Sequence, residues 1–213
     1  MSKSHPTRKR ALAPAAILFL TCAAVVRAAD PAASADAAVE PIRLNVTPIA
    51  ARKVTELPKG DLFWRVENFD SIEAAKAAAS HWSLAAEADG KAWLFTLGAK
   101  GGATPGGTGR AEIGPIQVVP ATNYLLRINR ASGVRGAITP VHSHPGSEAF
   151  FVLAGEQSIR TPHGTQVVKA GEPEAGHRPG MPMQVSSSGE ADLLSLVMFV
   201  VDADQPFAPP ASF

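Results

Sequence analysis

The chain has 213 residues, of which 46% are hydrophobic and 18% are charged, with one cysteine and a formal net charge of +1. This length and apolar content suit one ordinary domain with a buried core and exclude a disordered chain. The near-zero charge argues against a nucleic-acid binder, and the single cysteine excludes a disulfide framework and a cysteine-based zinc site.

Residues 1–28 have the pattern of a secretory signal peptide. A basic start containing Lys3 and Arg8 precedes an apolar run over residues 11–26, and small residues surround Ala28. A retained membrane anchor is the alternative, but the run is shorter than the roughly 20 residues of a spanning helix and contains Pro14. We therefore expect export to the periplasm or the medium, with no membrane span after processing.

Processing would change the charge of the protein. Cleavage after Ala28 removes five basic residues and Cys22, which leaves 15 basic residues against 19 acidic ones, a net charge of −4. A mildly acidic surface does not attract phosphate groups. The mature protein is therefore expected to bind no nucleic acid. A lipoprotein anchor at Cys22 is disfavoured, because Thr21 stands where such signals use a smaller residue.

The segments before the main β-rich region are taken in chain order. Residues 29–60 are rich in Ala and Pro without a sustained period, which predicts an extended arm or linker. Residues 61–122 are expected to form strands and a short helix packed on a barrel. The pattern predicts a strand at 62–69, a helix at 72–80 that begins with a capping box at Asp70 and Glu73, a hairpin at Asp89-Gly90 and a Gly-rich linker at 101–109.

From residue 113 onward, short β-prone segments alternate with Gly and Pro. This spacing is typical of an all-β sandwich or barrel. We expect a barrel core over residues 123–201 and a C-terminal tail over 202–213. The expected strands are residues 116–119, 124–129, 150–153, 157–160, 166–169, 184–187 and 193–201.

Three side chains between residues 142 and 148 suggest a metal site. His142 and His144 are two residues apart, so both side chains leave the same face of an extended strand. Pro145-Gly146 bends the chain, and Glu148 opens the next apolar segment, where its side chain can turn back toward the imidazoles. Two imidazoles and a carboxylate form an incomplete set of ligands for a divalent metal.

These residues also carry a resemblance to a known family. Gly136, His142, His144, Glu148 and Gly155 match the first motif of the cupin superfamily without a gap. The resemblance spans about residues 123–201 and implies a double-stranded β-helix, which is a small jelly-roll barrel. It further implies a metal near the barrel mouth, bound by the two histidines, the glutamate and a third histidine from a second motif.

The second motif departs from the family pattern. Met183 stands where the third histidine is expected, and His177 is the nearest histidine upstream. His177 could be a relocated third ligand, Met183 could bind through sulfur and favour copper, or the site could be open to water with three protein ligands. The sequence leaves all three open, and it leaves the metal open among Fe, Mn, Ni, Cu and Zn.

The surroundings of the expected metal suggest a substrate pocket. Phe150 shares a strand face with Glu148, while Arg127 and Gln184 are the nearest polar candidates to contact a small-molecule ligand or substrate. Cupins include dioxygenases, isomerases and sugar-binding proteins, so the fold does not decide the function. We expect an exported, metal-dependent oxygenase acting on a small oxygen-rich or aromatic compound. The alternative is a non-enzymatic cupin that binds a small molecule.

Cupins commonly form pairs, which suggests a homodimer for this chain. Adding or exchanging edge strands between copies also covers exposed sheet edges. The predicted arm, residues 29–60, is long enough to take part in such an exchange.

Overall fold

The computed structural model describes residues 40–213. The predicted signal peptide, residues 1–28, and the predicted arm up to residue 39 lie outside the described residues. Within residues 40–213, no helix is long and apolar enough to cross a membrane.

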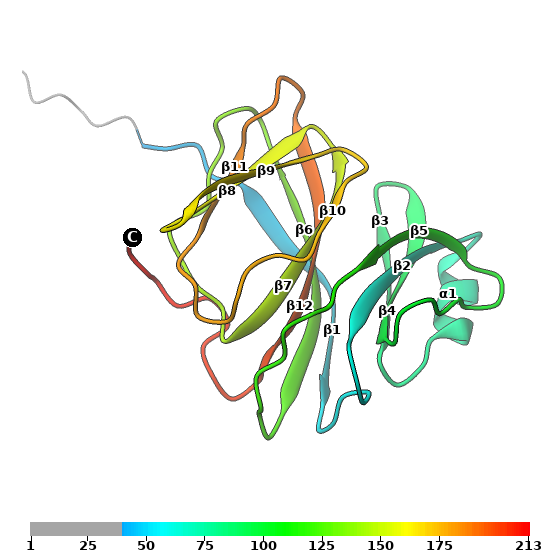
Figure 1. Cartoon of the computed structure of the whole chain (residues 1–213). Coiled ribbons are helices and arrows are strands. Elements are labelled where there is room, and N and C mark those ends of the chain that lie inside the picture. Colours follow the sequence, from blue (N-terminus) through cyan, green and yellow to red (C-terminus); the bar gives the residue numbers. More distant parts are fainter. Residues whose placement is uncertain (1–39) are drawn as a thin grey trace, which may run out of the picture. The chain divides into compact units, whose positions relative to one another are not determined.

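The described residues form three antiparallel sheets and one helix (Figure 1). The largest sheet has the order β1 (Asn45–Val54), β6 (Tyr124–Gly133), β12 (Leu193–Asp202), β7 (Gly146–Ala154) and β10 (Pro173–Glu174). The second sheet has the order β11 (Gln184–Ser187), β8 (Glu156–Thr161) and β9 (Gly164–Lys169). The third has the order β3 (Ser83–Ala88), β4 (Lys91–Gly98), β2 (Phe63–Phe69) and β5 (Thr108–Ile113), and it is accompanied by the helix α1 (Ile72–Ala78).

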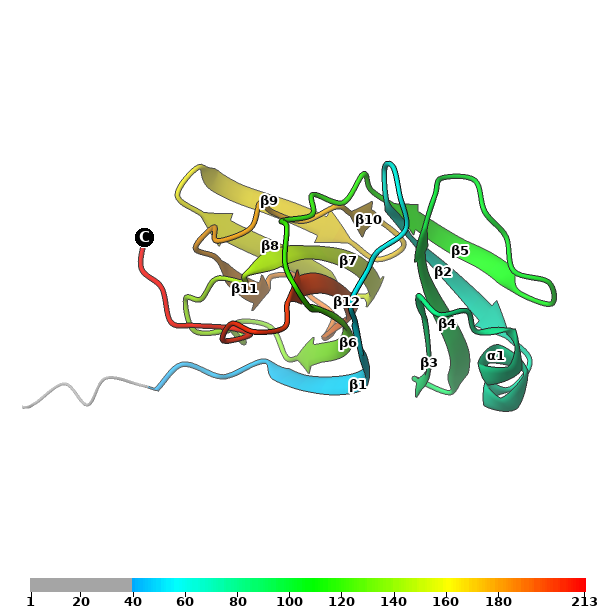
Figure 2. The ribbon, with the colours of Figure 1, turned by 90° about the horizontal axis from the view of Figure 1, so that it is seen from below.

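The five-stranded sheet is the middle layer of the fold (Figure 2). One of its faces meets the sheet of β8, β9 and β11 in an apolar cluster that includes Phe150, Ile159 and Phe199. Its other face meets the sheet of β2–β5 in a second cluster, which includes Trp93 and Phe151. The first two sheets form the jelly roll, and the expected all-β fold with one short helix before it is confirmed.

Strand alternation decides which side chains face the jelly-roll interior. Along β7, Phe150 and Val152 belong to the interior cluster, while Ala149 and Phe151 belong to the cluster against the third sheet. Since side chains alternate along a strand, Glu148 shares the interior face with Phe150, as the sequence predicted.

The helix and the hairpin of the third sheet form where the sequence predicted them. Asp89 and Gly90 have φ angles of 54° and 71° and join β3 to β4. The capping box was misplaced by one residue, because Ser71 is the N-cap and its hydroxyl accepts a hydrogen bond from the Ala74 N–H at 3.1 Å. Ser71 lies three residues before Ala74, the spacing that an N-cap hydroxyl needs to reach a free N–H of the first turn.

Three other expectations need correction. Residues 45–54 of the predicted arm form β1, which pairs with β6 of the same chain. The sequence did not indicate this strand, because most of its residues are exposed and show no alternation of apolar and polar side chains. Likewise β5 begins at Thr108, inside the predicted linker, and is exposed at its start. Residues 116–119 form no strand; they lie between Pro115 and Pro120, which have no N–H to donate to a ladder.

Gly136 and Gly155, the first and last residues of the first motif, allow a matched test of the fold. Both have positive φ, +84° at Gly136 and +71° at Gly155. A Cβ at Gly155 would lie 2.7 Å from the Asp192 carbonyl oxygen, whereas a Cβ at Gly136 would have no neighbour within 4 Å.

We therefore expect Gly155→Ala to destabilise the protein more than Gly136→Ala. Backbone strain alone costs about 1 kcal/mol in each variant, and the clash at Gly155 adds about 2 kcal/mol. Urea unfolding of both variants measures the difference. Equal losses of stability would contradict the close approach between Gly155 and Asp192.

Candidate metal and ligand site

A pocket of about 310 Å³ opens into the jelly roll. Its walls come from β1, β6, β7, β8, β11 and β12, from the segment before β7 and from the C-terminal tail. The lining is predominantly apolar, and its few polar side chains are Asn129, Thr139, His142, His144, Glu148 and Gln157. Three aromatic rings also line it, from Phe150, Phe199 and Phe207.

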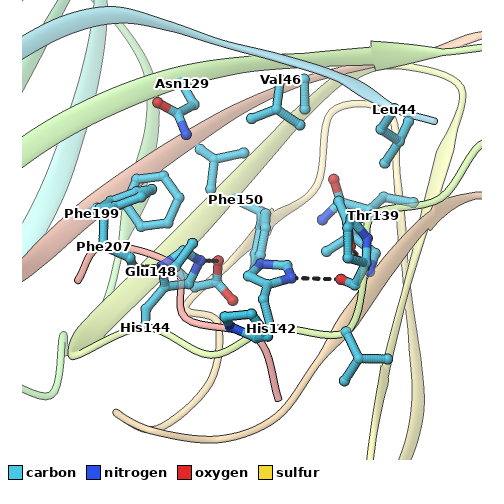
Figure 3. Close-up of a pocket in the computed structure, with 18 residues that line it drawn as sticks. Leu44, Val46, Asn129, Thr139, His142, His144, Glu148, Phe150, Phe199 and Phe207 are labelled. Carbon is cyan, nitrogen blue, oxygen red and sulfur yellow. Dashed lines mark hydrogen bonds and ion pairs between the residues drawn. The ribbon is translucent and has the colours of Figure 1, made fainter. Parts of the chain in front are cut away.

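The two histidines and the glutamate of the first motif meet in this pocket (Figure 3). The rings of His142 and His144 are nearly perpendicular, with centroids 4.9 Å apart. The His144 Nε2 atom lies 3.7 Å from the Glu148 Oε2 atom. The structure therefore brings together the three side chains that the motif selected.

Main-chain carbonyl groups orient both imidazoles. His142 Nδ1 lies 2.8 Å from the Pro140 carbonyl oxygen, and His144 Nδ1 lies 2.7 Å from that of Phe207. A carbonyl oxygen only accepts hydrogen bonds, so Nδ1 carries the proton in both rings and each Nε2 keeps a free lone pair. Histidines that bind metals are commonly held by such a bond at the other ring nitrogen.

Burial disfavours the charged forms of both His144 and Glu148. Desolvation raises the pKa of Glu148 to about 8. The pKa of His144 is lowered to about 4, mainly by desolvation and to a lesser extent by His142 and Arg127, while the hydrogen bond to the Phe207 carbonyl oxygen acts in the opposite direction. Burial therefore opposes an ion pair between the two side chains. The Glu148 Oε1 atom is also buried and has no hydrogen-bond partner among residues 40–213.

The main chain fixes the segment that carries the histidines, which precedes β7 and forms isolated bridges at His142 rather than the expected strand. His142 exchanges two hydrogen bonds with Met183, at 3.0 and 2.8 Å, and the Ser143 N–H donates to the Pro209 carbonyl oxygen. The Met183 side chain is packed in the interior cluster and does not line the pocket. Met183 thus holds His142 through its backbone.

His177 lies away from the three clustered side chains. It lines a different pocket, together with His163 and Thr161, and its Nε2 atom is buried without a hydrogen-bond partner in the described part of the chain. Of the three alternatives for the last ligand, the structure places neither His177 nor Met183 on the wall of the first pocket.

Of the three predicted substrate contacts, only one lines the pocket. Phe150 lines the pocket, as its strand face indicated. Arg127 does not: its guanidinium lies 4.1 Å from the centre of the Phe207 ring, and its Nε donates to Asn129 at 2.7 Å. The Gln184 amide instead donates to the Thr139 carbonyl oxygen, outside the lining.

Several lining residues were not singled out from the sequence. Phe199 and Gln157 lie on strands that were expected, and strand alternation relative to Val197 or Ile159 would have placed both inside. Phe207 lies in the Pro-rich C-terminal tail, and no periodic signal marks it. Its ring contacts His144 and Phe199, with centroid distances of 4.8 and 4.9 Å.

The donor chemistry suits a metal, but the coordination geometry is not already formed. No group of three or more His, Cys, Asp or Glu side chains in residues 40–213 is arranged to hold a metal ion. The two free Nε2 atoms and the unpaired Glu148 oxygen nevertheless supply the nitrogen and oxygen donors that divalent transition metals bind. A metal would have to draw these three side chains closer together.

The gapless first motif and the jelly-roll pocket that it lines resemble those of the cupin superfamily. The chain matches no protein-family model and no curated protein.

Parts of the chain resemble solved structures, two of which are named as cupins. A cupin superfamily protein from Desulfitobacterium hafniense is 14% identical over 36% of this chain and 68% of its own, with a TM-score of 0.33. A cupin-like protein from Thermotoga maritima is 17% identical over 41% of this chain and 65% of its own, with a TM-score of 0.37. The polyketide cyclase RemF from Streptomyces resistomycificus is 19% identical over 41% and 61%, with a TM-score of 0.35. These partial likenesses concern the fold.

The C-terminal tail is expected to stabilise the pocket. Phe207→Ala removes the ring that lies between Arg127, His144 and Phe199 and should lower the free energy of unfolding by about 2 kcal/mol. Phe213 is 46% exposed and serves as the control; Phe213→Ala should cost less than about 0.5 kcal/mol. Urea unfolding compares the two variants, and equal losses would show that the Phe207 ring does not stabilise the site.

Proposed function

We propose that this chain is an exported cupin that binds one divalent transition metal and acts as an oxygenase on a small, largely apolar or aromatic compound. The observation that carries the proposal is the set of free donors on one pocket wall. Two imidazoles, each fixed through Nδ1, present Nε2 beside a buried carboxyl group with an unpaired oxygen. The signal-peptide pattern of residues 1–28 supports export.

His142, His144 and Glu148 would hold the metal. With three protein ligands, a bound metal offers open positions that polarise the oxygen atoms of a compound or bind dioxygen beside it. Fe, Mn, Ni, Cu and Zn all suit this nitrogen and oxygen donor set. The Met183 thioether lies outside the pocket lining, so no sulfur donor favours copper here.

The rest of the pocket would bind and shield the compound. A volume of about 310 Å³ is near the lower end of the ~300–1,000 Å³ typical of ligand pockets. Apolar and aromatic side chains dominate the walls, which favours an apolar or aromatic body over a sugar with many hydroxyl groups. The same walls exclude water from the side of the compound that faces the imidazoles.

A non-enzymatic binding protein is the second candidate. The observation in its favour is that His142, His144 and Glu148 are the titratable side chains among the described residues that line the pocket. Once they hold a metal, no separate side chain remains there to move a proton as a general acid or base. Chemistry would then depend on the metal alone, and simple binding needs no proton transfer.

The homodimer remains a proposal of its own. Among residues 40–213, β1 lies at one end of the five-stranded sheet, so its outer edge is available to a strand from a second copy. The residues before β1 include Ile42, which is 57% exposed and would be covered by such pairing.

Metal content tests the first part of the proposal. We expect wild-type protein reconstituted with Fe(II), Mn(II) or Zn(II) and then desalted to retain about one equivalent, and His144→Ala and Glu148→Gln to retain below about a tenth. His163→Ala is the control, since His163 is exposed on the turn between β8 and β9. Atomic emission spectroscopy gives the metal content and circular dichroism verifies the fold. Equal retention by all four proteins would refute this metal site.

Oxygen consumption separates the two candidate functions. We expect Fe(II)-loaded protein to consume dioxygen when small aromatic diols such as catechol are added, and Ala208→Trp to be about tenfold slower. Ala208 lines the pocket yet is exposed, so a larger side chain there obstructs entry without overfilling the core. An oxygen electrode and calorimetry are used together. Binding without oxygen uptake would favour the binding protein and contradict the oxygenase.

A further inference from the structure

A second polar position in the pocket lies away from the candidate metal ligands. Gln157 on β8 is fully buried and lines the pocket. Neither its Oε1 nor its Nε2 atom has a hydrogen-bond partner among residues 40–213. A buried amide without partners costs stability, so such a group in a pocket wall is a candidate contact for a ligand.

The other two uncharged polar side chains in the lining are already engaged. The Asn129 Oδ1 atom accepts from Arg127, and the Thr139 hydroxyl accepts from the Val185 N–H at 3.0 Å. Gln157 therefore offers the free pair of an amide donor and an amide acceptor. Two further buried hydroxyl groups have no partner among residues 40–213: that of Ser187 on β11, which pairs with β8, and that of Ser195 on β12 of the middle sheet.

Strand register sets the distance between the two polar positions. Gln157 lies opposite Ser187, while His142 lies opposite Met183. Met183 and Ser187 are four residues apart in an extended segment, which corresponds to about 13 Å. The wall residues between these positions include Val185 and Phe150, which are apolar. The pocket is thus polar at two ends and apolar between them.

We propose that Gln157 is a specificity-determining anchor, and that the ligand is a neutral, elongated compound with an apolar ring body and a donor–acceptor head such as an amide or lactam. A neutral amide cannot compensate a full charge, and no charged side chain lines the pocket beyond the His142, His144 and Glu148 cluster in the described residues. Ligands with a carboxylate or phosphate group at the Gln157 end of the pocket are therefore excluded. The inference deepens the proposed function, because it concerns the compound that would approach the metal.

The test uses two probes that differ only at the head. The probes are 2-quinolone, a neutral bicyclic lactam, and N-methyl-2-quinolone, in which the donor is blocked. Calorimetry is carried out on the whole protein with EDTA present, so the outcome does not depend on metal binding. We expect 2-quinolone to bind about tenfold more tightly than its N-methyl analogue. Equal affinities, or binding of neither probe, would overturn the proposal without affecting the metal site.

Variants locate the effect at Gln157. Gln157→Leu should abolish the preference for 2-quinolone and raise the melting temperature of the ligand-free protein by about 2–4 °C, since it removes an unpaired buried amide. Gln184→Leu is the control, because the Gln184 side chain does not line the pocket and its amide already donates to the Thr139 carbonyl oxygen. It should leave the preference intact. If the preference for 2-quinolone survives in Gln157→Leu, Gln157 is not the anchor. The comparison of the two probes on the wild-type protein tests the proposal even if the variant fails to fold.

Discussion

The burial of both faces of one sheet constrains the rest of this structure. In β12, Val197 and Phe199 pack into the jelly-roll interior, while Leu196 and Met198 pack against the sheet of β2–β5. A shift of β12 by one residue would exchange these two sets, so the register is fixed by packing on both sides. β6 and β7 pair with β12 on either side, and the positions of Asn129 and Glu148 follow from that register.

The third sheet therefore affects the site without contacting it. Trp93 stacks near Phe95 and meets Phe151 edge to face, with centroids 6.4 Å apart across the layer boundary. Phe151 and Phe150 are neighbours on β7, so packing on the outer face holds the strand that presents Phe150 and Glu148 to the pocket. A small jelly roll alone would leave this outer face, with its large apolar side chains, exposed to water.

Sequence patterns predicted the parts of the molecule in which local chemistry and burial agree. The motif from Gly136 to Gly155 placed two histidines and a glutamate in one pocket, since strand alternation and a bend at Pro145 are local properties. The pattern could not reveal β1, whose exposed residues show no alternation, nor could it place His177, whose position depends on how the segment after β10 runs. Phe207 escaped notice because its contact with His144 joins residues 63 positions apart.

The pocket contains two sets of buried polar groups that lack full hydrogen-bonding partners among the described residues. Glu148 and His144 are buried close together, which shifts the pKa of each toward its neutral form, and the Gln157 amide is buried without a partner in the described residues. Burying the Glu148–His144 pair and burying the Gln157 amide each cost free energy that a purely apolar lining would avoid. The apolar clusters on both faces of the middle sheet contribute stability that opposes these costs. The unpaired groups thus differ in chemistry at the two ends: nitrogen and carboxyl donors suit a cation, and an amide suits a neutral hydrogen-bonding head. A compound bound between them would have a defined direction, with its reactive end toward the imidazoles.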